Sequence, residues 1–273
     1  MIPLRDNIPA RSLPFVNYGI IAITAIVFFA QLAEGTDDAS LVERFGMIPA
    51  RLTNPGQTVL IPEYDYVRTR QGIEVREAEP RPAAESAVPV WLTLLTCIFL
   101  HGGWLHFLGN MWFLHIFGDN VEDRFGHIGY LIFYLAGGVA ASIAHLLSAP
   151  GSMLPTIGAS GAIAAVMGAY LYLYPHSRVL TVVPIFFFLH MIVLPAPLFL
   201  GIWFVIQFFQ GAFAITAVES TGVAWWAHIG GFVAGLLVAL VLGRAHALRP
   251  PVEMRLPHTE DGFSARPLRR RGY

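Results

Sequence analysis

Long apolar stretches alternate with short polar ones over most of the chain. The apolar stretches lie at about residues 14–33, 104–120, 128–147, 160–174, 197–213 and 223–242. Crossing the hydrocarbon core of a bilayer takes about 20 apolar residues in a helix, and most of these stretches approach that length. The pattern predicts an all-α membrane protein built as a bundle of six transmembrane helices.

Three apolar stretches depart from the length of a simple span. Residues 160–174 would form a helix of only about 22 Å at a rise of 1.5 Å per residue, so this helix either thins the bilayer or begins below its surface. Residues 88–100 are apolar but short, and we expect an interfacial or partly inserted helix there. Residues 179–194 are interrupted by Pro184, which favours an interfacial hairpin or a re-entrant piece.

The polar segments divide the chain around this bundle. Residues 1–13 form a short segment before the first span, and residues 14–243 form the membrane domain. Within it, residues 34–89 make a long loop whose apolar content is too low for a separate core. Residues 244–273 form an arginine-rich tail that we expect to be disordered.

The composition fits a protein that lies in the bilayer. Hydrophobic residues make up 55% of the chain and charged residues 13%, and the formal net charge is −1. Soluble domains carry about 25% charged residues. No basic stripe interleaves with aromatic residues, so we expect no nucleic-acid partner. Cys97 is the only cysteine, which excludes an intramolecular disulfide and a cysteine-based zinc site.

The arginines predict the orientation. Arg5 and Arg11 precede the first span, Arg124 follows the second and Arg178 follows the fourth. The tail adds Arg244, Arg249, Arg255, Arg266, Arg269, Arg270 and Arg271. The opposite short loops, around Gly151 and Glu219, carry none. Positive charge stays on the cytoplasmic side, so we expect a multi-pass protein of the cytoplasmic (inner) membrane with both termini cytoplasmic and the loop 34–89 extracytoplasmic.

Ser160 opens the fourth apolar stretch and is a candidate nucleophile. Gly158 and Gly161 flank it, and Gly168 follows two turns later. A serine at a helix N-terminus lies beside free backbone N–H groups, which can stabilise an oxyanion. The alternative is a helix contact made of small residues, in which the serine only fills space.

His228 near the start of the sixth apolar stretch is a candidate base for this serine. Gly231 and Gly235 follow at the i+3 and i+7 positions, on the same helix face. That face could pack tightly against the glycine face of the fourth span. Serine needs a base to become nucleophilic, so the two residues support each other. The alternative is an interfacial histidine satisfied by backbone or water.

His106 and Asn110 are four residues apart on the second span and share one face. Two such donors would suit an oxyanion hole, whereas the alternative is a water-filled polar patch. His101 either belongs to the same cluster or lies in the headgroup region, and we favour the second. We expect Glu122 and Arg124 as a structural ion pair or loop anchor. No acidic residue offers an obvious third member, so serine and histidine would work as a dyad.

Together these residues resemble the rhomboid intramembrane serine proteases, over about residues 93–244. The matching motifs are His101-x4-His106-x3-Asn110, Glu122-Asp123-Arg124 followed by Gly126, Gly158-Ala159-Ser160-Gly161 and Ala227-His228-Ile229-Gly230-Gly231. The resemblance implies a rhomboid-like six-helix bundle. It also implies Ser160 as nucleophile, His228 as general base, and His106, Asn110 and the Ser160 N–H as the oxyanion hole.

The resemblance further implies a serine endopeptidase without metal or cofactor. It would cleave peptide bonds in or near transmembrane segments of other proteins within the lipid bilayer. The oligomeric state stays open. The main alternative is a non-proteolytic rhomboid-like binder of membrane proteins. A transporter with a histidine proton relay and a haem or metal protein are weaker alternatives, because the spans contain almost no acidic residues and their histidines do not face one another as pairs across helices.

Overall fold

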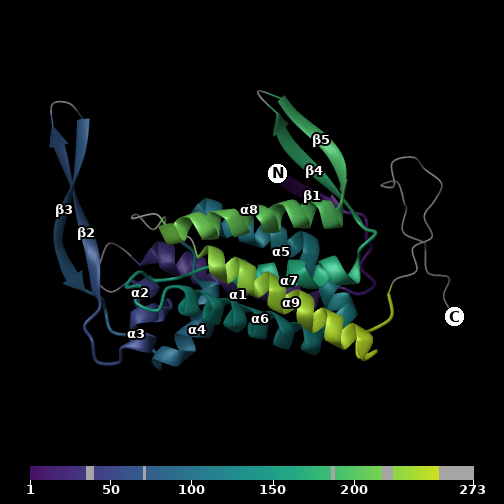
Figure 1. The fold of residues 1–273 in the computed structure, drawn as a ribbon, viewed down its shortest axis with the longest axis horizontal. Coiled ribbons are helices and arrows are strands. Elements are labelled where there is room, and N and C mark those ends of the chain that lie inside the picture. The colour runs from purple at the N-terminus through teal and green to yellow at the C-terminus, as the bar shows by residue number, and fades with distance from the viewer. Residues whose placement is uncertain (35–39, 70–71, 186–187, 217–223, 252–273) are drawn as a thin grey trace.

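The computed structural model describes residues 1–34, 40–69, 72–185, 188–216 and 224–251. A bundle of long helices forms its body, and two β-hairpins project from it near opposite ends (Figure 1). The long helices are α1 (Phe15–Ala33), α5 (Trp104–Phe125), α6 (His127–Ser148), α7 (Ser160–Leu173), α8 (Ala196–Thr216) and α9 (Trp225–Arg244). Each begins within about two residues of an apolar stretch in the sequence.

Several of these helices can cross a membrane by length and composition. Within the described residues, α1, α6 and α9 each qualify alone, and the segment Val90–Phe99 qualifies together with α5 at a bend of 81°. α7 and the part of α8 up to Phe209 are apolar but shorter. The protein is therefore mostly helical with three or four candidate spans, and a count of six stays a prediction.

The segment between α1 and α5 contains short elements and one hairpin. They are α2 (Leu41–Phe45), α3 (Pro49–Thr53), β2 (Leu60–Thr69), β3 (Gly72–Pro82), η1 (Val90–Leu92), α4 (Thr93–Thr96) and η2 (Cys97–Phe99). β2 and β3 pair in antiparallel fashion. The all-α class was therefore too narrow, because residues that alternate between apolar and charged types formed strands here.

A second sheet joins the two halves of the chain. β1 (Ile2–Asp6) pairs with β4 (Arg178–Ile185), and β4 pairs with β5 (Phe188–Pro195), all antiparallel. β4 and β5 are rich in valine, isoleucine and leucine, which favour strands. Residues 179–194 thus form a hairpin rather than a re-entrant piece. The N-terminal strand lies beside it across more than 170 residues of sequence.

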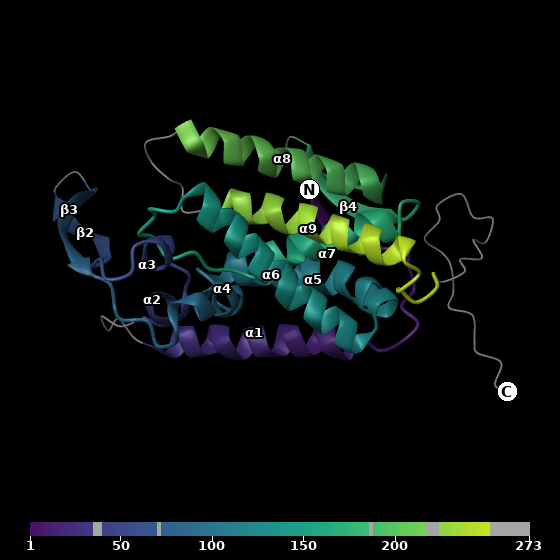
Figure 2. The ribbon, with the colours of Figure 1, turned by 60° about the horizontal axis from the view of Figure 1, so that its bottom comes forward.

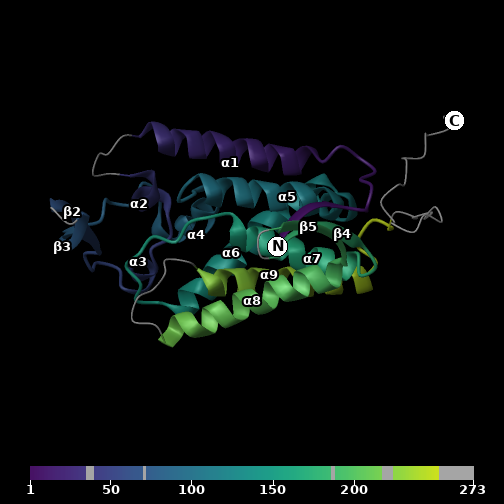
Figure 3. The same cartoon turned by 90° about the horizontal axis from the view of Figure 1, so that it is seen from above.

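α7 is the central helix of the bundle and packs against α9, α6 and α5, while α6 also packs against α9 (Figures 2 and 3). Residues 161–170 of α7 are all buried. A Cβ at Gly231 or Gly235 of α9 would collide with the carbonyl oxygen of Gly161 or Ala165 of α7. A Cβ at Gly168 would likewise collide with Phe232. These glycines therefore let the two backbones touch.

Two buried carboxylates fix the end of the bundle where α5 ends. Glu122 accepts hydrogen bonds from the N–H groups of Val16 and Asn17 at 3.1 and 2.8 Å, and contacts Nδ1 of His127 at 2.5 Å. It thereby caps the start of α1. The predicted loop anchor is present, but the ion pair with Arg124 was wrong, because Glu122 is turned toward the backbone of α1.

Asp123 and Arg124 extend this anchor to both ends of the described chain. Asp123 accepts hydrogen bonds from the Ser12 N–H at 3.2 Å and the Ser12 hydroxyl at 2.7 Å. Arg124 Nε donates to the Arg249 carbonyl at 2.7 Å. The three consecutive residues therefore hold the start of α1, the segment before it and the segment after α9.

A larger side chain at the glycine contact between α7 and α9 should force the two helices apart and destabilise the protein. We expect Gly235→Val to lower the free energy of unfolding by at least about 2 kcal/mol, because the added carbons meet backbone that cannot rotate away. Thermal unfolding in detergent measures this. Gly201→Ala on α8, where nothing lies within 4 Å of the added Cβ, is the matched control and should leave stability nearly unchanged. Equal melting temperatures for both variants would contradict the assignment.

Asp6 should make stability depend on pH. It accepts hydrogen bonds from Tyr170 at 2.5 Å and Asn120 at 2.8 Å. Burial raises the pKa of its carboxyl from 3.8 to about 7. The folded protein therefore favours the protonated form of Asp6. The contribution of this form to the free energy of unfolding is fully present below pH 3.8 and is lost as pH rises through about 7.

The melting temperature should accordingly fall between about pH 4 and pH 7, and Asp6→Asn should remove the part of the fall that Asp6 causes. Thermal unfolding of both proteins across this range measures the difference. Parallel melting curves at every pH would show that Asp6 does not titrate in this way.

Candidate active site

The start of α7 is set by the backbone of Gly158. Its φ of +128° is a conformation that residues with a side chain rarely adopt. A Cβ there would also lie 2.8 Å from Nε2 of His106. The Gly158 N–H donates to the Cys97 carbonyl at 2.9 Å, which ties this loop to η2. The chain can then turn directly into the first residue of the helix, Ser160.

Cys97 itself is enclosed by the bundle. Its side chain is buried, and its sulfur lies 3.4 Å from the hydroxyl of Ser142 on α6. η2 therefore provides a fixed support under the loop that carries Gly158.

Ser160 and His228 are in direct hydrogen-bond contact. The Ser160 Oγ and the His228 Nε2 are 2.7 Å apart. Ser160 is the first residue of α7 and His228 lies in the first turn of α9. The glycine contact between these helices brings their starts together. Backbone N–H groups in the first turn of α7 have no intrahelical acceptor, so they remain available beside the serine oxygen.

His106 and Asn110 extend from α5 toward the same place. The Gly102 N–H donates to Nδ1 of His106 at 3.3 Å, which leaves the ring proton of a neutral imidazole on Nε2, the atom next to Gly158. Asn110 is 8% exposed, and its Nδ2 has no hydrogen-bond partner in the structure. Both side chains therefore offer an unused N–H donor.

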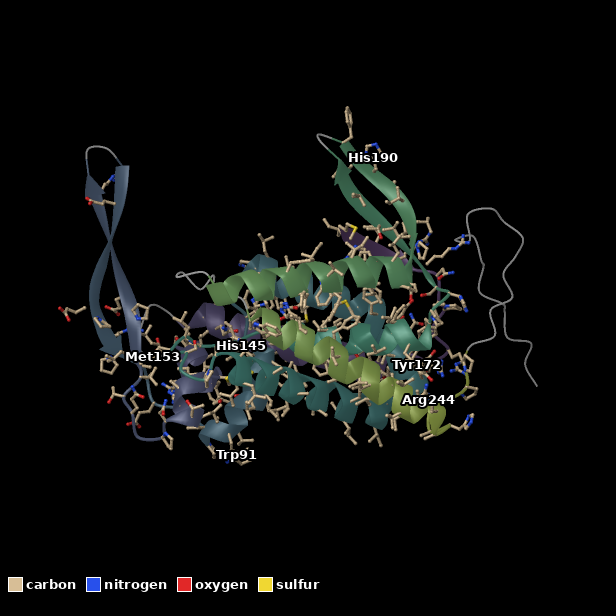
Figure 4. The ribbon with its side chains drawn as sticks, viewed as in Figure 1. Trp91, His145, Met153, Tyr172, His190 and Arg244 are labelled. Atoms are coloured by element: carbon tan, nitrogen blue, oxygen red, sulfur yellow. The ribbon has the colours of Figure 1, made fainter. Side chains whose placement is uncertain are left out.

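A cavity of about 680 Å³ unites these groups. Ser160, His228, His106 and Asn110 all line it, and its walls come from α5, α7, α8, α9 and the loop before α7. His145 and Met153 lie toward one end of the bundle and Arg244 toward the other (Figure 4). The cavity is lined by Pro155 and Thr156, which follow Met153 closely in the chain. The four residues singled out from the sequence thus line one cavity.

His101 lies inside the bundle beside His106. It is 3% exposed, and its ring centre is 5.1 Å from that of His106. Gln31 of α1 binds its backbone on both sides, with hydrogen bonds of 3.0 and 3.1 Å. The bend between η2 and α5 turns the histidine inward, which the sequence pattern alone did not indicate.

Two residues of α8 that were not predicted from the sequence, Gln207 and Trp203, also lie against His228. Gln207 Oε1 is 2.6 Å from Nδ1 of His228. The ring of Trp203, one turn earlier, has its centre 6.1 Å from that of His228. An amide in the middle of an apolar span is itself a signal of function, and Gln207 could have been found on that ground.

Metal ligands are not grouped in the part of the chain that the structure describes. There, no set of three or more His, Cys, Asp or Glu side chains is arranged to hold a metal ion. The polar groups that line this cavity include the Ser160 hydroxyl, the His228 imidazole in contact with it, and the nearby side chains of His106 and Asn110.

Known proteins match this chain over the same region. A family model described as Rhomboid domain matches residues 89–245, more than half of the chain. Rhomboid protease GluP of Bacillus subtilis (strain 168) is 33% identical over 153 residues, which cover 56% of this chain and 26% of that protein. RHOMBOID-like protein 4 of Arabidopsis thaliana is 28% identical over 232 residues, which cover 83% of this chain and 50% of that protein.

A third match is the Putative rhomboid protease YdcA of Bacillus subtilis (strain 168). It is 32% identical over 83 residues, which cover 30% of this chain and 41% of that protein. The chain thus spans between about a quarter and a half of the length of these relatives.

Proposed function

Because the chain belongs to the rhomboid family, we propose that it is an intramembrane serine endopeptidase that cleaves peptide bonds in or near transmembrane segments of membrane-protein substrates. Family membership supports intramembrane proteolysis in general, and two of its similar proteins carry protease names. The observation that carries the proposal for this chain is the 2.7 Å contact between Ser160 Oγ and His228 Nε2.

In the proposed reaction, His228 Nε2 takes the proton of Ser160 as the serine oxygen attacks the scissile carbonyl carbon. The carbonyl π electrons move onto its oxygen and form the tetrahedral oxyanion. The protonated His228 then gives its proton to the leaving amine nitrogen as the C–N bond breaks. Water, deprotonated by the same imidazole, hydrolyses the remaining ester and frees Ser160.

We assign the oxyanion hole to Asn110 Nδ2, His106 Nε2–H and the backbone N–H of Ser160. All three residues line the cavity, and Asn110 Nδ2 has no protein partner to give up. Donors that are already in position stabilise developing charge without reorganisation. Neither a metal nor a cofactor is required for these steps.

The substrates that suit this cavity are transmembrane segments that unwind easily. Carbonyl groups of an intact helix already accept hydrogen bonds, so a scissile bond must first leave the helix. Small or helix-breaking residues near the cut lower that cost. Apolar walls such as Leu105, Phe113 and Trp203 would contact the unwound segment.

We further propose that α1, α5, α6, α7, α8 and α9 are the six spans of a membrane domain at residues 14–243, in the cytoplasmic (inner) membrane. Residues 1–13 and the tail 244–273 would lie in the cytoplasm, and residues 34–89 would lie outside. Residues 252–273 of that tail lie outside the described residues. The distribution of arginines supports this orientation.

Fusions to the C-terminus test the orientation. A fluorescent protein that folds only in the cytoplasm should be bright after Tyr273, and alkaline phosphatase, which needs export, should be inactive there. The same reporters inserted between Asn54 and Gln57 should behave in the opposite way. Active phosphatase at the C-terminus would overturn the orientation.

Ser160 should react with a fluorophosphonate probe, because only an activated serine is phosphonylated. We expect the purified wild-type protein to be labelled and Ser160→Ala to lose all labelling. Ser148→Ala, at the exposed end of α6, is the matched control and should label normally. A non-proteolytic binder predicts no difference between wild type and Ser160→Ala, and that result would sink the protease proposal.

Removing Asn110 should slow catalysis without preventing folding. Loss of one oxyanion donor costs roughly 10²- to 10³-fold in rate, so we expect this loss in cleavage of a membrane-protein reporter by Asn110→Ala. Leu108→Ala, an exposed position on the same helix, serves as the control for α5. An Asn110→Ala enzyme with wild-type turnover would exclude the amide from the oxyanion hole.

A further inference from the structure

Gln207 is an inward-facing polar residue on a helix whose neighbouring side chains face outward. Its side chain is 8% exposed, while Ile206 and Phe208 on either side are each 46% exposed. Its Oε1 lies 2.6 Å from Nδ1 of His228. A primary amide in an apolar span is costly unless it is hydrogen-bonded, and here the imidazole is the partner.

We propose that Gln207 is a positioning residue that holds His228 in the one tautomer able to act as a base. The amide oxygen accepts the Nδ1–H proton, so Nε2 carries the lone pair that faces Ser160 Oγ at 2.7 Å. This inference rests on the proposed protease function and replaces the simple dyad with a chain of three side chains from α8, α9 and α7.

The opposite tautomer would block the reaction. With its proton on Nε2, the imidazole could only donate to Ser160 and could not take the serine proton. Among the described residues, the aromatic side chains beside the ring are Trp203 and Trp225, at ring-centre distances of 6.1 and 5.9 Å, and neither selects against that tautomer. Indole N–H groups donate hydrogen bonds and do not accept them.

A neutral acceptor suits this environment better than a carboxylate. The titratable groups that face His228 are His106 on α5 and His145 on α6, while α7 contributes Ser160 and α8 contributes Gln207. No acidic side chain among the described residues faces the ring. A charged carboxylate buried at this position would be costly. The neutral amide orients the imidazole and leaves Nε2 free to exchange a proton with Ser160.

The test compares Gln207→Leu and Gln207→Glu by the rate of fluorophosphonate labelling at Ser160 across pH, in the full-length protein. Leucine keeps the volume but removes the acceptor, and we expect labelling to slow by roughly ten- to a hundredfold, less than the ~10⁴-fold loss when a triad histidine adopts the wrong tautomer. Glutamate restores the acceptor, so labelling should recover. Its charge also stabilises the imidazolium, so the acidic limb of the pH profile should move to higher pH.

Phe208→Leu, on the outward face of the same helix, controls for changes in α8 and should match wild type. A second readout does not depend on activity. In ¹⁵N-histidine spectra, the His228 signal, identified by its absence from His228→Ala, should show a protonated Nδ1 in wild type and mixed tautomers in Gln207→Leu.

The outcomes separate the two proposals. Wild-type protein that is not labelled at Ser160 overturns the protease function and the role of Gln207 with it. Labelled wild-type protein with an equally labelled Gln207→Leu variant overturns the role of Gln207 alone. A wild-type His228 protonated at Nε2 does the same, even if both variants are slow.

Discussion

The backbone contact between α7 and α9 is the interaction on which the rest of the structure depends. Helices in lipid gain no hydrophobic advantage from associating, so close packing has to hold them together. Gly231 and Gly235 meet the carbonyl oxygens of Gly161 and Ala165, and no side chain separates the two helices there. Because each helix starts close to this contact, the distance between Ser160 and His228 follows from it.

The polar groups at the two ends of the bundle differ in their hydrogen-bond partners. At one end, the carboxylate oxygens of Glu122 and Asp123 accept hydrogen bonds from the backbone N–H groups of Val16, Asn17 and Ser12. That network joins distant segments and leaves little for a ligand. At the other end, Asn110 keeps an unused donor facing a cavity, and the Ser160 hydroxyl contacts only an imidazole among the side chains described. The first arrangement stabilises a fold, whereas the second is suited to chemistry.

The helices and the paired serine and histidine could be predicted because they depend on local signals. Apolar length defined α1 and α6 closely, and the glycines beside Ser160 and His228 signalled that their helices could touch. Contacts that depend on how a helix is rotated could not be predicted. Three examples are the direction in which Gln207 points, the inward turn of His101, and the contacts of Glu122. Glu122 accepts hydrogen bonds from the backbone of α1 and does not pair with Arg124. The pairing of β1 with β4 could not be predicted either, since the two strands are more than 170 residues apart in the sequence.

The enclosed thiol of Cys97 has a practical consequence. Thiol reagents react with exposed thiolates, and this sulfur is 3% exposed and lies against the Ser142 hydroxyl. Since the chain has no other cysteine, a cysteine introduced at a surface position would be the one thiol that a spin label or fluorophore can reach. The native sequence is thus already a suitable background for measuring distances between its helices with labels placed one or two at a time.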